Sequence, residues 1–110
     1  MTSELRARIC ALNDQFRRDL QGGTILLTHG VRRLGSGFVE DALMAVAKFD
    51  DFSEANDPHG EHDFGLIQID DQSLFWKIDY FDEGLSAAAD DPSNPSSCHR
   101  VMTIMLAEEY

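Results

Sequence analysis

Apolar residues near the start of the chain recur every three or four positions, which is the period of an amphipathic α-helix. They are Leu5, Ile9, Leu12, Phe16 and Leu20. Thr2 or Ser3 can cap the start of this helix. Gly22 and Gly23 follow it and can adopt the left-handed conformation that ends helices. The pattern therefore predicts one helix that carries this stripe and begins directly after its cap.

Two further elements are predicted before residue 50. Residues 24–28 are β-branched or aliphatic and are typical of a buried strand, and an exit loop is expected to follow, made of His29, Gly30, Arg32 and Arg33. A second helix is predicted over residues 38–49, with Ser36 or Gly37 as its cap. Its apolar face comprises Phe38, Ala42, Ala45, Val46 and Phe49.

The second half of the chain alternates between apolar runs and polar loops. Residues 64–69 and 73–81 are separated by a short acidic turn, which predicts a hairpin. Residues 50–63 and 82–97 lack both helical and strand periodicity and are predicted to be long loops. Residues 100–106 suit either a strand or a short helix, and the strand is favoured by their β-branched residues. We therefore predict an α+β fold with two helices packed on a small, mainly antiparallel β-sheet.

The length and charge of the chain exclude several classes of function. A chain of 110 residues with 43% hydrophobic residues fits a single domain, residues 1–110. The formal net charge is −11, from 9 Lys and Arg against 20 Asp and Glu. Such a surface repels phosphate backbones and anionic lipids, so direct binding to nucleic acid or to a membrane is not expected. No long apolar run is present, and a cytoplasmic location is predicted.

Several strings together carry a resemblance to a known family. They are ALNDQFRR from Ala11, LTHG from Leu27, FDDFSEANDPHGEHDFG from Phe49, FWKIDYFD from Phe75 and RVMTIMLAEEY from Arg100. In this combination and order they resemble the DUF3768 family of small bacterial proteins, and the resemblance covers nearly the whole chain. It implies a single bacterial domain and supplies no activity and no cofactor, because the function of that family is unknown.

The loop at residues 50–63 holds the densest set of groups that could bind a metal or transfer protons. The set comprises Asp57, His59, Glu61, His62 and Asp63. Its spacing fits neither a helical zinc-protease motif nor a calcium-binding EF-hand loop, and the cysteines Cys10 and Cys98 lack zinc-site spacing. The alternative is structural: Asp57 accepts backbone N–H groups in a turn and His62 or Asp63 fixes the loop onto the next strand.

Lys77 and Asp79 stand at alternate positions in an otherwise aromatic strand, so they share one face of the predicted sheet. If that face is open, they are surface charges. If it is covered, they must pair with groups such as Glu61, His62 or Arg33, which would make a buried candidate site.

Two functions remain. The first is a non-enzymatic acidic protein that docks on a basic protein surface, with carboxylates that could imitate the phosphates of a nucleic acid in the manner of anti-CRISPR or anti-restriction inhibitors. The acids expected to carry it are Asp50, Asp51, Glu54, Asp57, Asp70, Asp71, Asp90 and Asp91. The second is a small metal-binding protein or enzyme centred on residues 59–63, with Lys77 and Asp79 as further members of the polar site. No cofactor is predicted, and the identity of any metal is left open.

Overall fold

A computed structural model describes residues 2–110. In chain order its elements are α1 (Ser3–Asp19), β1 (Gly23–Leu27), α2 (His29–Arg32), α3 (Ser36–Lys48), β2 (Phe64–Ile69), β3 (Gln72–Phe81), β4 (His99–Leu106) and the 3-10 turn η1 (Ala107–Glu109). The α+β class is confirmed. Among the described residues, no helix combines the length and apolar character that crossing a bilayer requires.

The four strands form one sheet in the order β1-β4-β3-β2. β2 and β3 are the predicted antiparallel hairpin, and β4 pairs antiparallel with β3. β1 runs parallel to β4, so the prediction of a mainly antiparallel sheet is wrong and the sheet is mixed. The reason is topological: after β1 the chain crosses to the far edge of the sheet before β2, and β4 then inserts beside β1 in the same direction.

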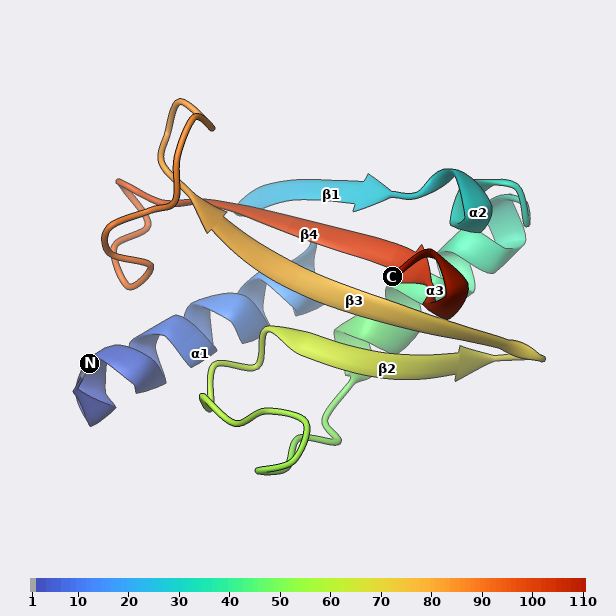
Figure 1. Ribbon diagram of the computed structural model, residues 1–110, viewed down its shortest axis with the longest axis horizontal. Helices are drawn as coiled ribbons and strands as arrows, with labels where there is room; N and C mark the ends of the chain where they lie inside the picture. The colour runs from blue at the N-terminus through green and yellow to red at the C-terminus, as the bar shows by residue number, and fades with distance from the viewer. Residues whose placement is uncertain (1) are drawn as a thin grey trace.

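The hydrophobic core lies on the side of the sheet that faces α1 and α3 (Figure 1). Trp76 and Leu74 of β3 are fully buried there, together with Val46 of α3 and Phe16 of α1. Gly65 pairs with Trp76 across the hairpin, and a Cβ atom at Gly65 would collide with the indole ring. The strand alternation therefore points the core residues of β3 toward the helices, as the period of two predicts.

The opposite face of the sheet is open. Apart from the short η1 turn, no element of residues 2–110 lies over it (Figure 1). Lys77 and Asp79 stand on this face, with side chains 41% and 42% exposed, and their Nζ and Oδ2 atoms are 2.9 Å apart. They are surface charges that pair with each other, so they do not join the polar loop at residues 50–63.

Several element boundaries differ from their predictions. α1 ends at Asp19, and its C-cap is Leu20, which takes the left-handed conformation with φ 57° that was expected of Gly22 or Gly23. The N-cap of α3 is Gly35, with φ 95°, and not Ser36 or Gly37. The predicted exit loop forms the short helix α2. β1 is an edge strand that is only half-buried, because it has a neighbour on one side alone.

Candidate functional site

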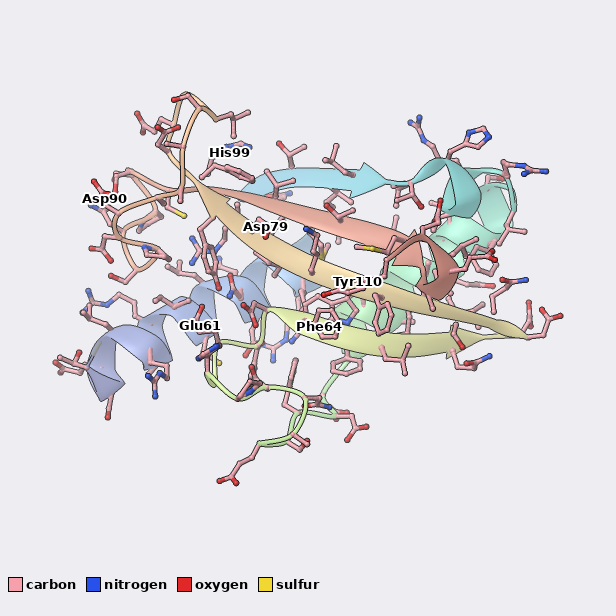
Figure 2. The ribbon with its side chains drawn as sticks, viewed as in Figure 1. Glu61, Phe64, Asp79, Asp90, His99 and Tyr110 are labelled. Carbon is pink, nitrogen blue, oxygen red and sulfur yellow. The ribbon has the colours of Figure 1, made fainter. Side chains whose placement is uncertain are left out.

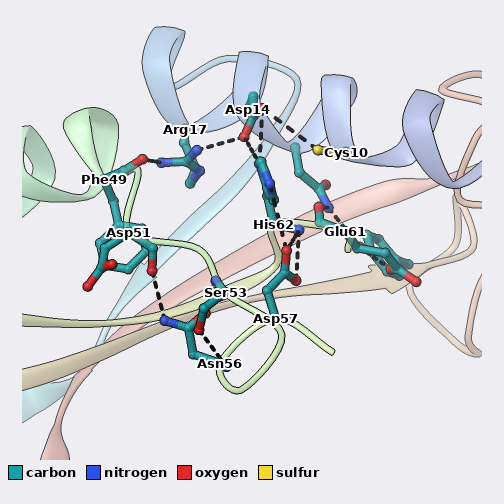
Figure 3. A network of polar contacts seen from close by, with 12 residues as sticks. Cys10, Asp14, Arg17, Phe49, Asp51, Ser53, Asn56, Asp57, Glu61 and His62 are labelled. Atoms are coloured by element: carbon teal, nitrogen blue, oxygen red, sulfur yellow. Dashed lines mark hydrogen bonds and ion pairs between the residues drawn. The ribbon is translucent and has the colours of Figure 1, made fainter. Parts of the chain in front are cut away.

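The polar loop at residues 50–63 is folded against α1 through a network centred on His62 (Figure 3). His62 has φ 56°, a left-handed conformation that is uncommon for a non-glycine residue. Its ring stacks on Phe52, with centroids 3.7 Å apart and planes 4° from parallel. Its Nδ1 atom lies 2.9 Å from Asp14 Oδ1. The loop backbone and Phe52 together therefore aim this imidazole at the middle of α1.

Asp57 lies on the other side of the same imidazole. Its carboxylate is 5% exposed and accepts a hydrogen bond from the backbone N–H of His62 at 3.2 Å, while its Oδ2 lies 3.7 Å from His62 Nε2. This is the turn role that the structural alternative predicts for Asp57. Because Asp57 is buried, it is not available to a docking partner, unlike the other acids proposed for that role.

Asp14 is shared between His62 and a buried arginine. Arg17 Nη2 donates to Asp14 Oδ1 at 2.7 Å, and Arg17 is only 1% exposed. Burial alone would raise the pKa of Asp14, but the hydrogen bonds from Arg17 and His62 together hold the pKa below its ordinary value. Asp14 therefore remains ionised at neutral pH.

Arg17 also closes the C-terminal end of α3. Its Nη1 donates to the backbone carbonyl of Val46, in the last turn of α3, at 2.7 Å and to that of the C-cap residue Phe49 at 2.9 Å. Its guanidinium lies 5.1 Å from the ring centroid of Trp76 and 5.2 Å from that of Phe52. One buried cation thus joins α1, α3 and the polar loop.

Cys10 stands one helical turn before Asp14, and its Sγ donates to Asp14 Oδ2 at 3.8 Å. Burial, together with the charges of Asp14 and Asp57, raises the pKa of this thiol to about 11. The thiol is therefore protonated at neutral pH, which is the opposite of what a cysteine nucleophile requires.

A second network is centred on Asn13, the residue directly before Asp14 in α1, which is fully buried. The Asn13 amide donates to the Tyr80 hydroxyl at 2.7 Å and to the Glu61 carbonyl at 3.0 Å, and its Oδ1 accepts from Arg100 Nε at 2.7 Å. The Tyr80 hydroxyl donates to Glu61 Oε1 at 2.8 Å. Burial is the main cause that raises the pKa of Tyr80, so this hydroxyl stays protonated. Glu61 is thus held by α1 and β3.

The remaining members of the predicted polar cluster do not converge with His62. The backbone carbonyl of Asp63 accepts from Ile78 N–H at 2.8 Å, and burial followed by the charge of Glu61 raises the pKa of its carboxyl group. His59 is exposed. The arrangement therefore separates into a His62 network, a Glu61 network and an exposed histidine.

The acids predicted to bind a partner lie at three places around the sheet. Figure 1 shows the hairpin turn at one end, the loop at residues 82–97 at the other, and the loop at residues 50–63 beside β2; Figure 2 labels Asp90 on the second of these. The exposed members are Asp50, Asp51, Glu54, Asp70, Asp71, Asp90 and Asp91. They surround the sheet and do not form one continuous patch.

Sequence reasoning missed the α1 side of both networks. Asn13, Asp14 and Arg17 interrupt the apolar stripe, and polar residues on an amphipathic helix are expected to face solvent. The available signal was the close spacing of Asp14 and Arg17, three residues apart, which allows an ion pair on one helix face.

Replacing His62 by asparagine is expected to lower the free energy of unfolding by about 1–3 kcal/mol, because Asp14 and Asp57 lose their shared partner. Asparagine tolerates the left-handed backbone, so the substitution tests the imidazole and not the turn. The measurement is urea unfolding of His62→Asn beside His59→Ala, whose exposed side chain should change stability by less than about 0.5 kcal/mol. Equal stabilities for the two variants would contradict the assigned role of His62.

Comparison with known proteins gives one finding. A family model described as "Protein of unknown function (DUF3768)" matches residues 27–109. The match contains His62, Glu61 and Tyr80, whereas α1 with Cys10 and Asn13 lies outside it. No curated protein matches the chain, and no solved structure matches it.

Proposed function

This chain belongs to the DUF3768 family, and because that family has no assigned activity, we propose a function from the physical character of the surface. We propose that the protein is a non-enzymatic binding protein that docks on a basic partner protein through the open face of its sheet. The main observation in support of this proposal is that the open face has an apolar part, with exposed acids at both ends of the sheet. Interfaces between proteins commonly have this composition, with apolar residues at the centre and polar residues at the rim.

The apolar part of the open face lies over β2 and β3. Phe64, Phe75 and Tyr110 form an aromatic cluster there, with ring centroids 5.1–6.0 Å apart. Tyr110 is 75% exposed, and Leu66 beside the cluster is 54% exposed. Water therefore contacts large apolar side chains that a partner could cover, with Tyr110 as an aromatic anchor of the kind enriched at interfaces.

The charge of the acids at the ends of the sheet determines the partner class. Asp70 and Asp71 lie at one end of the sheet, and Asp90 and Asp91 lie at the other (Figure 1). Residues 36–110 hold 17 acids against three basic residues, a balance of −14. A field of this sign increases the association rate with a basic surface and disfavours acidic ones. A lysine- or arginine-rich partner with an apolar patch is the complementary surface.

The finer form of this proposal is that the partner itself binds nucleic acid and that the acids occupy its phosphate sites. Seven of the eight acids named for that role are exposed, which supports a broad electrostatic surface. Their distribution over three loops favours contact along an extended basic groove over contact with one phosphate pocket. Competition by duplex DNA for the same partner distinguishes this form from docking on another basic protein.

The partner can be identified by photo-crosslinking in the source organism. A photoreactive residue replaces Leu66 on the open face, and a matched control replaces Met44 of α3, which is 56% exposed on the helix side. We expect crosslinks to one basic protein from position 66 alone. That protein is then purified for binding measurements, because capture from cells does not by itself establish direct docking.

Neutralising the hairpin acids is expected to slow association. Asp70→Asn with Asp71→Asn removes two charges from the hairpin turn at one end of the sheet, whereas Glu4→Gln with Asp19→Asn removes two exposed charges from α1 on the helix side. The first pair should lower the association rate constant severalfold, and the second should change it much less, because steering depends on charge near the docking face. Surface plasmon resonance against the purified partner provides the measurement. Equal effects of the two pairs would contradict docking through this face.

A further inference from the structure

We propose that Cys10, Asp14 and His62 form a binding site for a zinc ion, with the fourth position open to water. This inference is independent of the docking proposal, since the site lies on the helix side and the docking face lies on the other side of the sheet. Figure 3 shows the three side chains pointing toward one another from α1 and from the polar loop. Their sulfur, oxygen and nitrogen ligand atoms all lie within 4.8 Å of one another.

The distances agree with a tetrahedral metal. Cys10 Sγ is 3.8 Å from Asp14 Oδ2, and His62 Nδ1 is 3.2 Å from the same oxygen. Zinc bonds of ~2.0–2.3 Å in tetrahedral geometry place neighbouring ligand atoms about 3.3–3.6 Å apart. Small side-chain movements therefore suffice, and Cys10 and Asp14 are already one helical turn apart on the same side of α1.

The surroundings resemble the outer shell of a zinc site. Arg17 donates to Asp14 Oδ1, which also lies 2.9 Å from His62 Nδ1. Asp14 Oδ2 lies 3.8 Å from Cys10 Sγ and 3.2 Å from His62 Nδ1. Asp57 Oδ2 is 3.7 Å from His62 Nε2, so a small side-chain movement lets it accept a hydrogen bond from the N–H of that nitrogen when Nδ1 binds the metal. A carboxylate behind a metal-bound histidine orients the ring and increases its basicity. The stacking of His62 on Phe52 fixes the ring in this orientation.

The ligand set indicates which metal fits. One thiolate, one imidazole and one carboxylate are the ligand types that zinc accepts, whereas calcium and magnesium require oxygen ligands. Binding exchanges the thiol proton for the metal: the S–H bond of Cys10 breaks, a Zn–S bond forms and one proton leaves to solvent. Binding through Nδ1 requires that this nitrogen carry no proton, so the ring proton of His62 stands on Nε2 in the complex. The affinity should therefore increase with pH.

Cobalt(II) is the probe for this site, because it accepts the same ligands and its thiolate complexes absorb in the near ultraviolet. The wild-type protein and Cys98→Ser should both develop this absorption when Co²⁺ is added, and Zn²⁺ should abolish it by displacement. Cys10→Ser should lack the absorption, and His62→Asn should bind Co²⁺ about tenfold more weakly or worse. Circular dichroism of each variant verifies that it is folded.

The outcomes separate the zinc site from a purely structural network. Absence of the thiolate absorption in the wild-type protein would overturn the inference, as would its persistence in folded Cys10→Ser or its loss in folded Cys98→Ser. A second readout is thermal: Zn²⁺ should raise the melting temperature of the wild-type protein and Cys98→Ser but not of Cys10→Ser. None of these outcomes tests the docking proposal, because the residues substituted for docking lie outside the proposed zinc site.

Discussion

Arg17→Ala is expected to lower the free energy of unfolding by about 3–5 kcal/mol, the usual effect of breaking a buried ion pair by removing one partner. Three groups lose their shared donor at once: the Asp14 carboxylate and the carbonyls of Val46 and Phe49 at the end of α3. Arg17 is 1% exposed, so water does not readily replace its guanidinium group. Urea unfolding at neutral pH measures the effect.

The matched control is Arg18→Ala, one residue farther along α1 on the exposed side. It should change stability by less than about 0.5 kcal/mol. Because the pKa of Asp14 is lowered in the folded state, its ionic contribution is present above the ordinary value of 3.8 and is lost as the pH falls through the lower folded value. The difference between wild type and Arg17→Ala should therefore shrink in strong acid. Similar losses for the two arginines would contradict this account of α1.

Asn13→Ala is the second substitution with a large expected effect. Without the Asn13 side chain, Arg100 Nε loses its acceptor and the Glu61 carbonyl loses its donor. Arg100 is only 3% exposed, so water does not readily take the place of the lost acceptor. An unsatisfied buried group costs about 1–3 kcal/mol, and more when it is charged, so a total loss of roughly 3 kcal/mol is expected. Gln15→Ala on the exposed side of α1 is the control and should have little effect.

A leucine at position 13 separates hydrogen bonding from volume. Asn13→Leu fills the same space without a donor or an acceptor, so it should be about as destabilising as Asn13→Ala. Recovery of most of the stability by leucine would show that position 13 requires volume alone. The Asn13 network would then not be what holds Glu61 beside Tyr80.

The parts of the fold that follow from local periodicity could be predicted from the sequence. The alternation from Phe75 to Phe81 placed Lys77 and Asp79 on one face of the strand, and the structure confirms both this shared face and the antiparallel hairpin of β2 and β3. The stripe on α1 identified the buried Ile9 and Phe16. In each case neighbours within a few residues determine the pattern, so one segment contains the information.

The missed features depend on contacts between distant segments. Arg17 is buried because carbonyls 29 and 32 residues away need a donor, and Asn13 is buried because Arg100, 87 residues away, needs an acceptor. The parallel pairing of β1 with β4 likewise depends on the path of the whole chain. A window of sequence treats these polar side chains as solvent-exposed, and only the assembled fold supplies their partners.

Contacts with distant segments also determine where the polar side chains of the loop at residues 50–63 lie. His59, Glu61, His62 and Asp63 were predicted to form one polar site because they are close together in the sequence. The fold directs neighbouring residues of this loop to different partners. Glu61 contacts Tyr80, and His62 contacts Asp14. The structural role predicted for Asp57 is confirmed by its hydrogen bond from the His62 backbone.

The association rate constant of the crosslinked partner, measured at increasing sodium chloride concentration, tests the proposed docking function most directly. Salt screens charges beyond a Debye length of about 8 Å at physiological ionic strength, so steering by separated acidic loops should weaken steeply as salt is added. We predict a wild-type rate constant that falls with salt and a flatter dependence for the Asp70→Asn, Asp71→Asn double variant. A wild-type rate constant that does not change with salt would contradict docking through the acidic surface.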